Sequence, residues 1–161
     1  MAGAVGGERW SLAGATALVT GGSKGIGHAI VEELAGFGAR HGAADLEECH
    51  RCITVSVCDV AVRADWEKLM DTVKATFDRK LDIMLDGEVS GPVQPPAEYT
   101  AEHYSRIMAT NLESCFHLCQ LAHPLLIKAS VASGGSVIDT SSIASFLAFP
   151  QETLYSVTKG T

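Results

Sequence analysis

A glycine-rich turn near the N-terminus constrains the fold of this chain more than any other feature. The apolar run Ala15–Val19 is followed directly by Thr20–Gly27, which reads TGGSKGIG. Gly21 permits a tight turn, Gly25 lets the backbone approach a diphosphate, and Gly27 lets the next helix pack closely on the strand. The sequence therefore predicts a strand, a turn and a helix that bind a dinucleotide. A glycine-rich turn without a ligand is the alternative.

The residues after this turn have the spacing of an amphipathic helix. Apolar side chains recur along one face, at Ile26, Ala29, Ile30, Leu34 and Phe37. The unpaired N–H groups and the positive dipole end of such a helix favour an anion. The diphosphate therefore needs no dedicated arginine.

Short apolar runs and amphipathic segments alternate along the rest of the chain. The runs predict strands at Thr16–Thr20, Ile53–Val57, Leu81–Leu85 and Ser136–Thr140. The segments predict helices at Gly25–Phe37, Leu46–Cys52, Arg63–Phe77 and Thr100–Ala129, the last bent near Pro124. This alternation is typical of an α/β protein with a Rossmann-like, doubly wound parallel sheet and a site at the carboxyl ends of its strands. We expect a flexible tail at residues 1–8 and one domain at 9–161.

Composition and net charge exclude some classes of binding partner. The 161 residues are 47% hydrophobic and 19% charged, which suits a single domain with a buried core. A formal charge of −7, from 12 basic and 19 acidic residues, argues against nucleic acid or an anionic membrane surface as a partner. Met1–Gly7 lacks the pattern of a signal peptide, and no apolar run reaches the roughly 20 residues of a membrane span. We expect a cytoplasmic protein.

Five cysteines raise the question of a metal site. Cys49 and Cys52 have C-x-x-C spacing, and Cys115 and Cys119 stand one helical turn apart. A zinc site needs four ligands, and no second C-x-x-C or H-x-x-x-H motif completes a set. We therefore predict free thiols and no metal. A redox role for Cys49 and Cys52 is a more remote alternative.

Further motifs follow the glycine turn in a fixed order. Asp59 and Val60 follow Cys58, Asn111 stands in the segment MATNL, and Ser142 precedes Tyr155 by 13 residues in a chain that then reads YSVTK. Together with T-G-x-x-x-G-x-G, these motifs resemble the short-chain dehydrogenase/reductase family. The residues around them are most similar to its plant tropinone reductase-like branch.

The resemblance implies a site and a chemistry. Tyr155 would donate a proton to a substrate carbonyl while hydride arrives from a nicotinamide, and Ser142 would hydrogen-bond the carbonyl oxygen. Asn111 would sustain a proton relay through Lys159, whose ammonium would stabilise the phenolate and hold the nicotinamide ribose. The implied cofactor contacts are Gly21, Ser23, Lys24, Gly25, Ile26, Gly27, Asp59, Val60, Tyr155 and Lys159.

The cofactor expected from the residues is NADP rather than NAD. Lys24 and Arg40 are cations that suit the additional phosphate of NADP. Asp45 stands near the place of an NAD-type acid, but the segment after it favours its interpretation as a helix N-cap.

Three departures from the family pattern weaken the expected site. After Arg40 the residues HGAAD replace a strand, so we expect the second strand to be missing. Asp86–Val89 replaces a family asparagine pair, and we expect Asp86 and Gly87 to form a solvated turn. The chain ends two residues after Lys159, so the C-terminal strands of the family are also expected to be missing.

Two functions are compatible with these matches to the family pattern and these departures from it. The first is an NADP(H)-dependent oxidoreductase that reduces a small ketone to an alcohol. The second is a catalytically impaired remnant that binds nucleotides weakly or acts as an interaction module. Its partners would be a second copy of the chain or a full-length relative.

Overall fold

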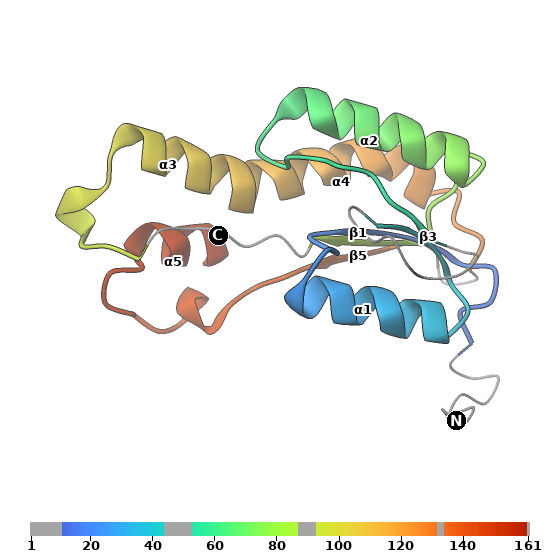
Figure 1. The fold of residues 1–161 in the computed structure, drawn as a ribbon, viewed down its shortest axis with the longest axis horizontal. Helices are drawn as coiled ribbons and strands as arrows, with labels where there is room; N and C mark the ends of the chain where they lie inside the picture. The colour runs from blue at the N-terminus through green and yellow to red at the C-terminus, as the bar shows by residue number, and fades with distance from the viewer. Residues whose placement is uncertain (1–10, 44–52, 87–92, 132–133, 161) are drawn as a thin grey trace.

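The computed structural model describes residues 11–43, 53–86, 93–131 and 134–160. Within them, one parallel sheet of five strands has the order β3-β2-β1-β4-β5 (Figure 1). The strands are β1 (Thr16–Thr20), β2 (Arg40–Ala43), β3 (Ile53–Thr54), β4 (Ile83–Asp86) and β5 (Ser136–Asp139). The order turns back at β1, from which one half of the sheet runs to β3 and the other to β5. The predicted doubly wound α/β fold is confirmed.

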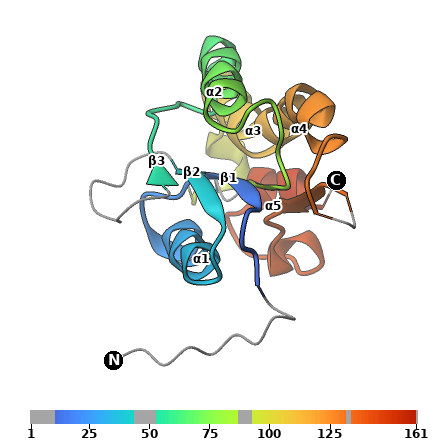
Figure 2. The same ribbon diagram turned by 90° about the vertical axis from the view of Figure 1, so that its right-hand side faces the viewer.

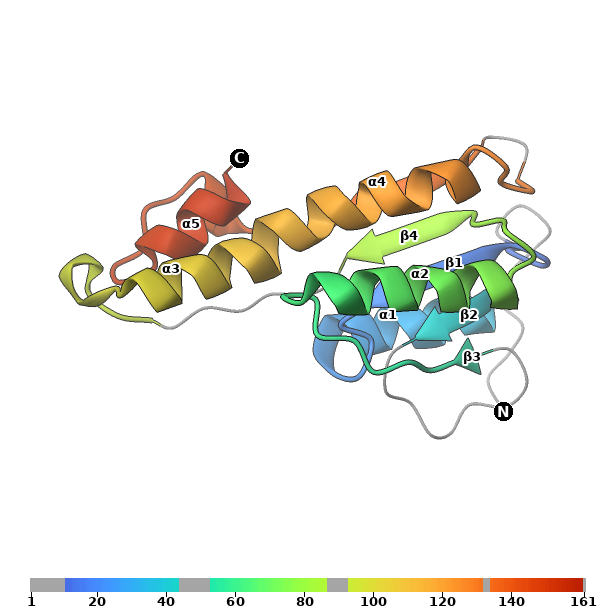
Figure 3. The same cartoon turned by 90° about the horizontal axis from the view of Figure 1, so that it is seen from above.

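Helices cover both faces of this sheet. The longer helices are α1 (Gly25–Gly36), α2 (Arg63–Thr76), α3 (Ala101–Met108), α4 (Ser114–Leu126) and α5 (Thr153–Lys159). Short 3-10 turns lie at η2 (Pro96–Glu98) and η4 (Ile143–Ser145). Helix α1 lies on one face, and α2 and α4 lie on the other (Figures 1 and 2). Seen from above, α3 continues the line of α4 beyond the end of the sheet, toward which β4 points (Figure 3).

The core is divided between these two faces. Side chains alternate along β1, so Leu18 packs under α2 and α4 while Val19 packs against Val31 of α1. The larger cluster is formed by Leu18, Trp66, Leu69, Met70, Val73, Phe77, Leu81, Met84, Leu118, Ala122, Leu125 and Leu126. The apolar periodicity of the sequence thus fixes which face of each helix meets the sheet. None of the described helices is long and apolar enough to cross a membrane.

A buried carboxylate joins the strands at the opposite end of the sheet from the glycine turn. Asp82, which is 0% exposed, accepts hydrogen bonds from the backbone N–H and hydroxyl of Thr16 at 2.8 and 2.9 Å. It also accepts from the backbone N–H groups of Ser130 and Val131 at 2.5 and 3.0 Å. Burial opposes ionisation, but these hydrogen bonds outweigh it and hold the pKa of Asp82 below its ordinary value. Asp82 therefore ties β1 and β4 to the loop before β5.

The expectation that the second strand is missing is wrong. Arg40–Ala43 forms β2, which pairs in parallel with β1 on one side and with β3 on the other. Glycine and alanine are poor strand formers, yet a strand between two others gains main-chain hydrogen bonds along both edges. Tertiary pairing therefore overrides the local preference. The helix predicted at Leu46–Cys52 and the tail at residues 1–8 lie outside the described residues.

The other predicted elements are present with shifted ends. Two strands differ most, since Ile53–Thr54 is shorter than predicted and Ile83–Asp86 begins two residues later. The single helix predicted at Thr100–Ala129 is divided by a π-helical segment, η3 (Ala109–Glu113), between α3 and α4. Pro124 lies within α4.

Candidate active site

The glycine turn has the shape that a diphosphate requires. Gly21 and Gly25 have φ angles of +64° and +59°, in the left-handed region that other residues rarely adopt. A Cβ atom on Gly27 would lie 2.4 Å from the carbonyl oxygen of Gly21, so only glycine lets α1 approach the turn this closely. The turn thus fits the group for which the sequence predicts it.

The remaining residues of the turn are accessible. Ser23, Lys24 and Ile26 are exposed at the start of α1, and Ile26 is 73% exposed. The first turn of α1 contains no acidic residue. An anion at this helix end therefore meets N–H donors and the Lys24 cation without an opposing carboxylate.

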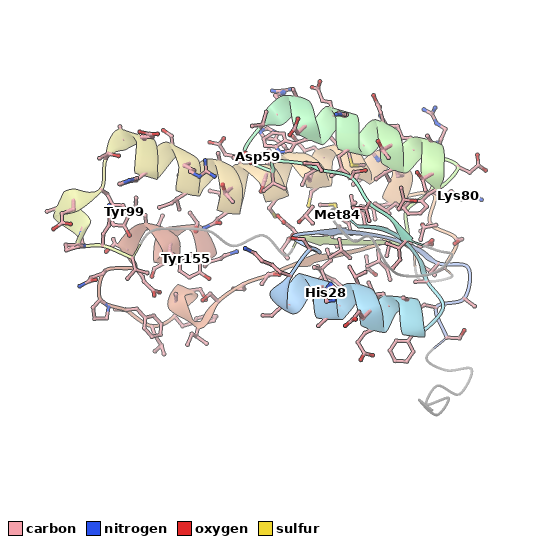
Figure 4. The ribbon with its side chains drawn as sticks, in the orientation of Figure 1. His28, Asp59, Lys80, Met84, Tyr99 and Tyr155 are labelled. Atoms are coloured by element: carbon pink, nitrogen blue, oxygen red, sulfur yellow. The ribbon has the colours of Figure 1, made fainter. Side chains whose placement is uncertain are left out.

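On the other face of the sheet, Asp59 and Val60 shape the turn before α2. The Asp59 carboxylate accepts from the N–H of Ala61 at 2.9 Å, and the Asp59 N–H donates to Asp65 at 3.0 Å. Val60 is buried, and its carbonyl accepts from the indole N–H of Trp66 at 2.6 Å. Figure 4 places Asp59 above the sheet and His28 of α1 below it. Val60 lines a small pocket with Thr20 and Gly21 at the end of β1, and the adenine contact of Asp59 and Val60 stays a prediction.

Asp86 is not part of a solvated turn, contrary to expectation. It is the last residue of β4, 5% exposed, and its carboxylate accepts from the Thr20 hydroxyl at 2.5 Å. Its carbonyl accepts from the N–H of Thr140. A parallel neighbour on each side encloses this position, so the carboxylate joins the ends of β1 and β4. Gly87 lies outside the described residues.

Asn111 lies in the π-helical segment, buried between α3 and α4. Its amide N–H donates to the hydroxyl of Thr158 at 3.2 Å, and that hydroxyl donates to the carbonyl of Tyr155 at 2.8 Å. A π-helical turn widens a helix locally and is frequent at functional sites. Here it presents Asn111 to α5, the helix that bears Tyr155 and Lys159.

Lys159 reaches from α5 to the sheet. Its Nζ donates to the carbonyl of Thr140, the residue after β5, at 2.7 Å. Burial lowers the pKa of this ammonium, and the negative charges of Asp86 and Asp139 partly oppose that effect. The side chain is therefore placed at the carboxyl ends of β4 and β5.

Ser142 and Tyr155 are half-buried beside this contact. Ser142 caps η4, where its oxygen accepts from the N–H of Ala144 at 3.1 Å, so its hydroxyl proton can serve another acceptor. Tyr155 lies on α5, beyond the strand ends (Figure 4). Helix α5 packs on η3, which contains Asn111, and on η4, which Ser142 caps.

Sequence reasoning missed the residues that hold α5 in place. Thr158, 4% exposed, connects α5 to Asn111, and Gln151 accepts through its carbonyl from the Tyr99 hydroxyl at 3.1 Å. The same carbonyl accepts from the N–H of Gln94 at 3.0 Å. One signal was available for Thr158, which lies inside the tyrosine–lysine motif and beside Lys159. Nothing in the sequence pairs Gln151 with a loop more than fifty residues earlier.

Some predicted residues cannot be placed. The Arg40 side chain, Asp45, Cys49 and Cys52 lie outside the described parts of the structure. Cys58, Cys115 and Cys119 are free cysteines. Burial, with the charges of Asp65 and Asp59, raises the pKa of Cys58 to about 11, so this thiol is protonated at neutral pH.

Comparison with known proteins shows the family to which this fold and these motifs belong. Residues 15–161 match the family model described as short chain dehydrogenase. The chain belongs to the short-chain dehydrogenase family. Two tropinone reductase homologs of Arabidopsis thaliana are each 51% identical to it, over 94% and 95% of this chain. Senescence-associated protein 13 of the same plant is 49% identical over 95%. This family member spans about 60% of the length of each of these relatives.

A solved structure supports the fold of this family member. A protein of Sinorhizobium meliloti, described as a short-chain alcohol dehydrogenase, superimposes with a TM-score of 0.83 over 94% of this chain and 63% of its own. Its sequence is 24% identical, so the likeness concerns the fold alone.

Proposed function

We propose that this protein is an NADP(H)-dependent oxidoreductase that reduces a small ketone to an alcohol. One arrangement carries the proposal. The Asn111–Thr158 and Lys159–Thr140 hydrogen bonds hold α5 at the carboxyl edge of the sheet, and the glycine turn opens at that same edge. Family membership adds the class of reaction, and the tropinone reductase homologs among the relatives suggest a ketone as substrate.

The residues present fit a dinucleotide. The turn around Gly21 and Gly25 would hold the diphosphate, Asp59 and Val60 the adenine, and Lys159 the nicotinamide ribose. When bound, NADPH supplies the hydride. Lys24 is exposed at the start of α1, and its positive charge suits the additional phosphate of NADP.

Side chains of the protein supply the proton that the reduction transfers to the substrate oxygen. The Tyr155 hydroxyl donates it to the substrate oxygen, while the Ser142 hydroxyl donates a hydrogen bond to that same oxygen. Lys159, half-buried with a lowered pKa, passes a replacement proton toward Tyr155. Asn111 holds the helix that carries both groups.

The test compares Tyr155→Phe with Tyr104→Phe, a tyrosine that is 51% exposed on α3. The assay follows NADPH oxidation with a panel of small ketones, beside a fluorescence titration of NADPH binding. We expect Tyr155→Phe to abolish turnover without weakening NADPH binding, and Tyr104→Phe to leave both unchanged. Equal turnover in the two variants would refute the role of Tyr155. Binding without turnover in the unaltered chain would support the impaired remnant instead.

A further inference from the structure

Two cysteines and a carboxylate converge between α4 and the end of β5. Cys115 and Cys119 lie one turn apart on α4, and Asp139 is the last residue of β5. Their sulfur and oxygen atoms all lie within 4.8 Å of one another. The Cys115 thiol donates to Asp139 Oδ1 at 3.1 Å. Cys119 also packs against the core, but the proposed reduction assigns this cluster no role.

The fold creates the cluster by packing α4 across the outer part of the sheet. Residues four apart on a helix share a face, and α4 contacts both β4 and β5. The face that bears Cys115 and Cys119 therefore meets the carboxyl end of β5. Both thiols are half-buried, whereas Asp139 is exposed, so the cluster has an apolar floor and an opening to solvent.

We propose that Cys115, Cys119 and Asp139 form a binding site for a soft divalent metal ion of the zinc class. Zinc takes thiolate and carboxylate ligands at about 2.0–2.3 Å, which separates neighbouring ligand atoms in a tetrahedron by about 3.4–3.8 Å. Cys115 Sγ and Asp139 Oδ1, now 3.1 Å apart, would separate slightly, and the other ligand atoms, at most 4.8 Å apart, would approach by up to about 1 Å through side-chain rotation. A water molecule completes the tetrahedron on the exposed side. Two sulfur ligands favour zinc over magnesium or calcium, which prefer oxygen.

Metal binding at this cluster releases the protons of the two thiols. The two thiol protons leave to the buffer as the metal–sulfur bonds form, and the Asp139 carboxylate binds without losing a proton. No electron is transferred. The ion then carries three negative ligands and lies close to the site of Lys159, whose charge partners include Cys115 and Asp139.

The structure supplies the ligand that the sequence pattern lacked. His117 stands between the two cysteines in the sequence, but its ring stacks on Trp66 at 5.3 Å and its Nδ1 lies 3.0 Å from Gln120 Oε1. Asp139, twenty residues after Cys119, takes that place. Cys115 and Cys119 are free cysteines, as the sequence predicts, and the expectation that they bind no metal stays a prediction that the experiment tests.

The experiment uses Co²⁺ as a spectroscopic probe for zinc. Cys49 and Cys52 are replaced by alanine throughout, since their C-x-x-C spacing could bind metal independently. In this background we expect a thiolate-to-cobalt charge-transfer band that saturates at one ion per chain and that Zn²⁺ removes. Cys115→Ala with Cys119→Ala should abolish the band. Asp139→Asn should weaken Co²⁺ binding at least about tenfold and keep the band at saturation.

Cys58→Ala is the matched control, because Cys58 is a half-buried free thiol outside the cluster. It should bind Co²⁺ like the background. Circular dichroism establishes that each variant is folded. A folded background without the band, or an Asp139→Asn variant that binds as tightly as the background, would overturn the site. These readouts need neither cofactor nor turnover, so they are independent of the proposed reduction.

Discussion

The two strands that lead into the site, β1 and β5, differ sharply in their surroundings. Every residue of β1 is buried, and β1 pairs with β2 on one side and β4 on the other. Every residue of β5 is exposed, and among the described strands only β4 pairs with it. The glycine turn therefore extends from the most buried strand of the described sheet, whereas the segment that leads to Ser142 and α5 extends from its exposed edge.

The helices that follow these strands repeat the contrast. Helix α1 has twelve residues, and its approach to the sheet is set by backbone contact at Gly27. Helix α5 has seven residues, of which Thr158 is the buried one, and side-chain hydrogen bonds hold it. Isolated helices of this length are marginal in water. We therefore expect nucleotide binding to resist mild perturbation and turnover to be sensitive to it.

Gly27→Ala should have the largest effect. The added methyl would lie 2.4 Å from the Gly21 carbonyl oxygen, which is backbone and cannot rotate away. We expect a loss of about 3 kcal/mol or more in the free energy of unfolding and the loss of NADPH binding, because α1 must move off the turn. Urea denaturation and fluorescence titration measure the two effects.

Gly36→Ala provides the matched control in the same helix. A Cβ at Gly36 meets nothing within 4 Å, and the position is exposed. The substitution should leave binding intact and stabilise the protein by up to about 1 kcal/mol, since alanine favours a helix more than glycine does. Similar losses in the two variants would show that α1 is not held by close approach.

Asp82→Asn should have the next largest effect. The amide cannot accept all the hydrogen bonds that the carboxylate receives from Thr16, Ser130 and Val131, and it places a donor against donors. We expect a loss of about 2–3 kcal/mol in the free energy of unfolding at neutral pH, measured by urea denaturation.

The pH dependence gives a sharper test of Asp82. Because folding lowers its pKa, its stabilising contribution is present above the ordinary carboxyl pKa of about 3.9 and is lost as the pH falls through the lowered value. The gap in stability between the unaltered chain and Asp82→Asn should therefore narrow below about pH 4. A gap that stays constant in acid would contradict the role of the ionised carboxylate.

Valine-to-threonine substitutions in β1 and β5 compare the two strands directly. Val19 is 1% exposed and packs on Val31 and Leu85, whereas Val137 is 44% exposed. Val19→Thr buries a hydroxyl among apolar groups and should cost about 1–2 kcal/mol. Val137→Thr should change stability by less than about 0.5 kcal/mol, because threonine suits an exposed strand. Equal costs would mean that β5 is covered in solution.

The same contrast decides which parts of the fold the sequence could predict. Motifs with local physics, such as the turn at Gly21–Gly27 and the helix after it, were predicted closely because one short segment contains the whole signal. The strand β2 was missed because its stability comes from neighbours on both sides rather than from its own residues. Asp86 was misjudged for a related reason, since its partner Thr20 belongs to another strand.

The sequence likewise predicts some features of the candidate site and not others. The tyrosine–lysine motif and Asn111 could be found from family resemblance. Their mutual placement could not, because it depends on Thr158 and Thr140, which the motif does not single out. The cysteine pair illustrates the limit, since the sequence shows Cys115 and Cys119 but not that Asp139 of another element faces them.

Thr158→Val should have a small effect on stability and the most specific effect on function. Valine keeps the shape of threonine but removes the hydroxyl that accepts from Asn111 and donates to the Tyr155 carbonyl. We expect a loss of about 1 kcal/mol in the free energy of unfolding. Turnover should fall at least about tenfold, because a small displacement of a catalytic group is costly, while NADPH binding changes little. Thr153→Val, at the exposed start of α5, is the control and should leave both quantities unchanged. If NADPH binding fell with turnover in Thr158→Val, the segments that follow β1 and β5 would be coupled, and the contrast between them would fail.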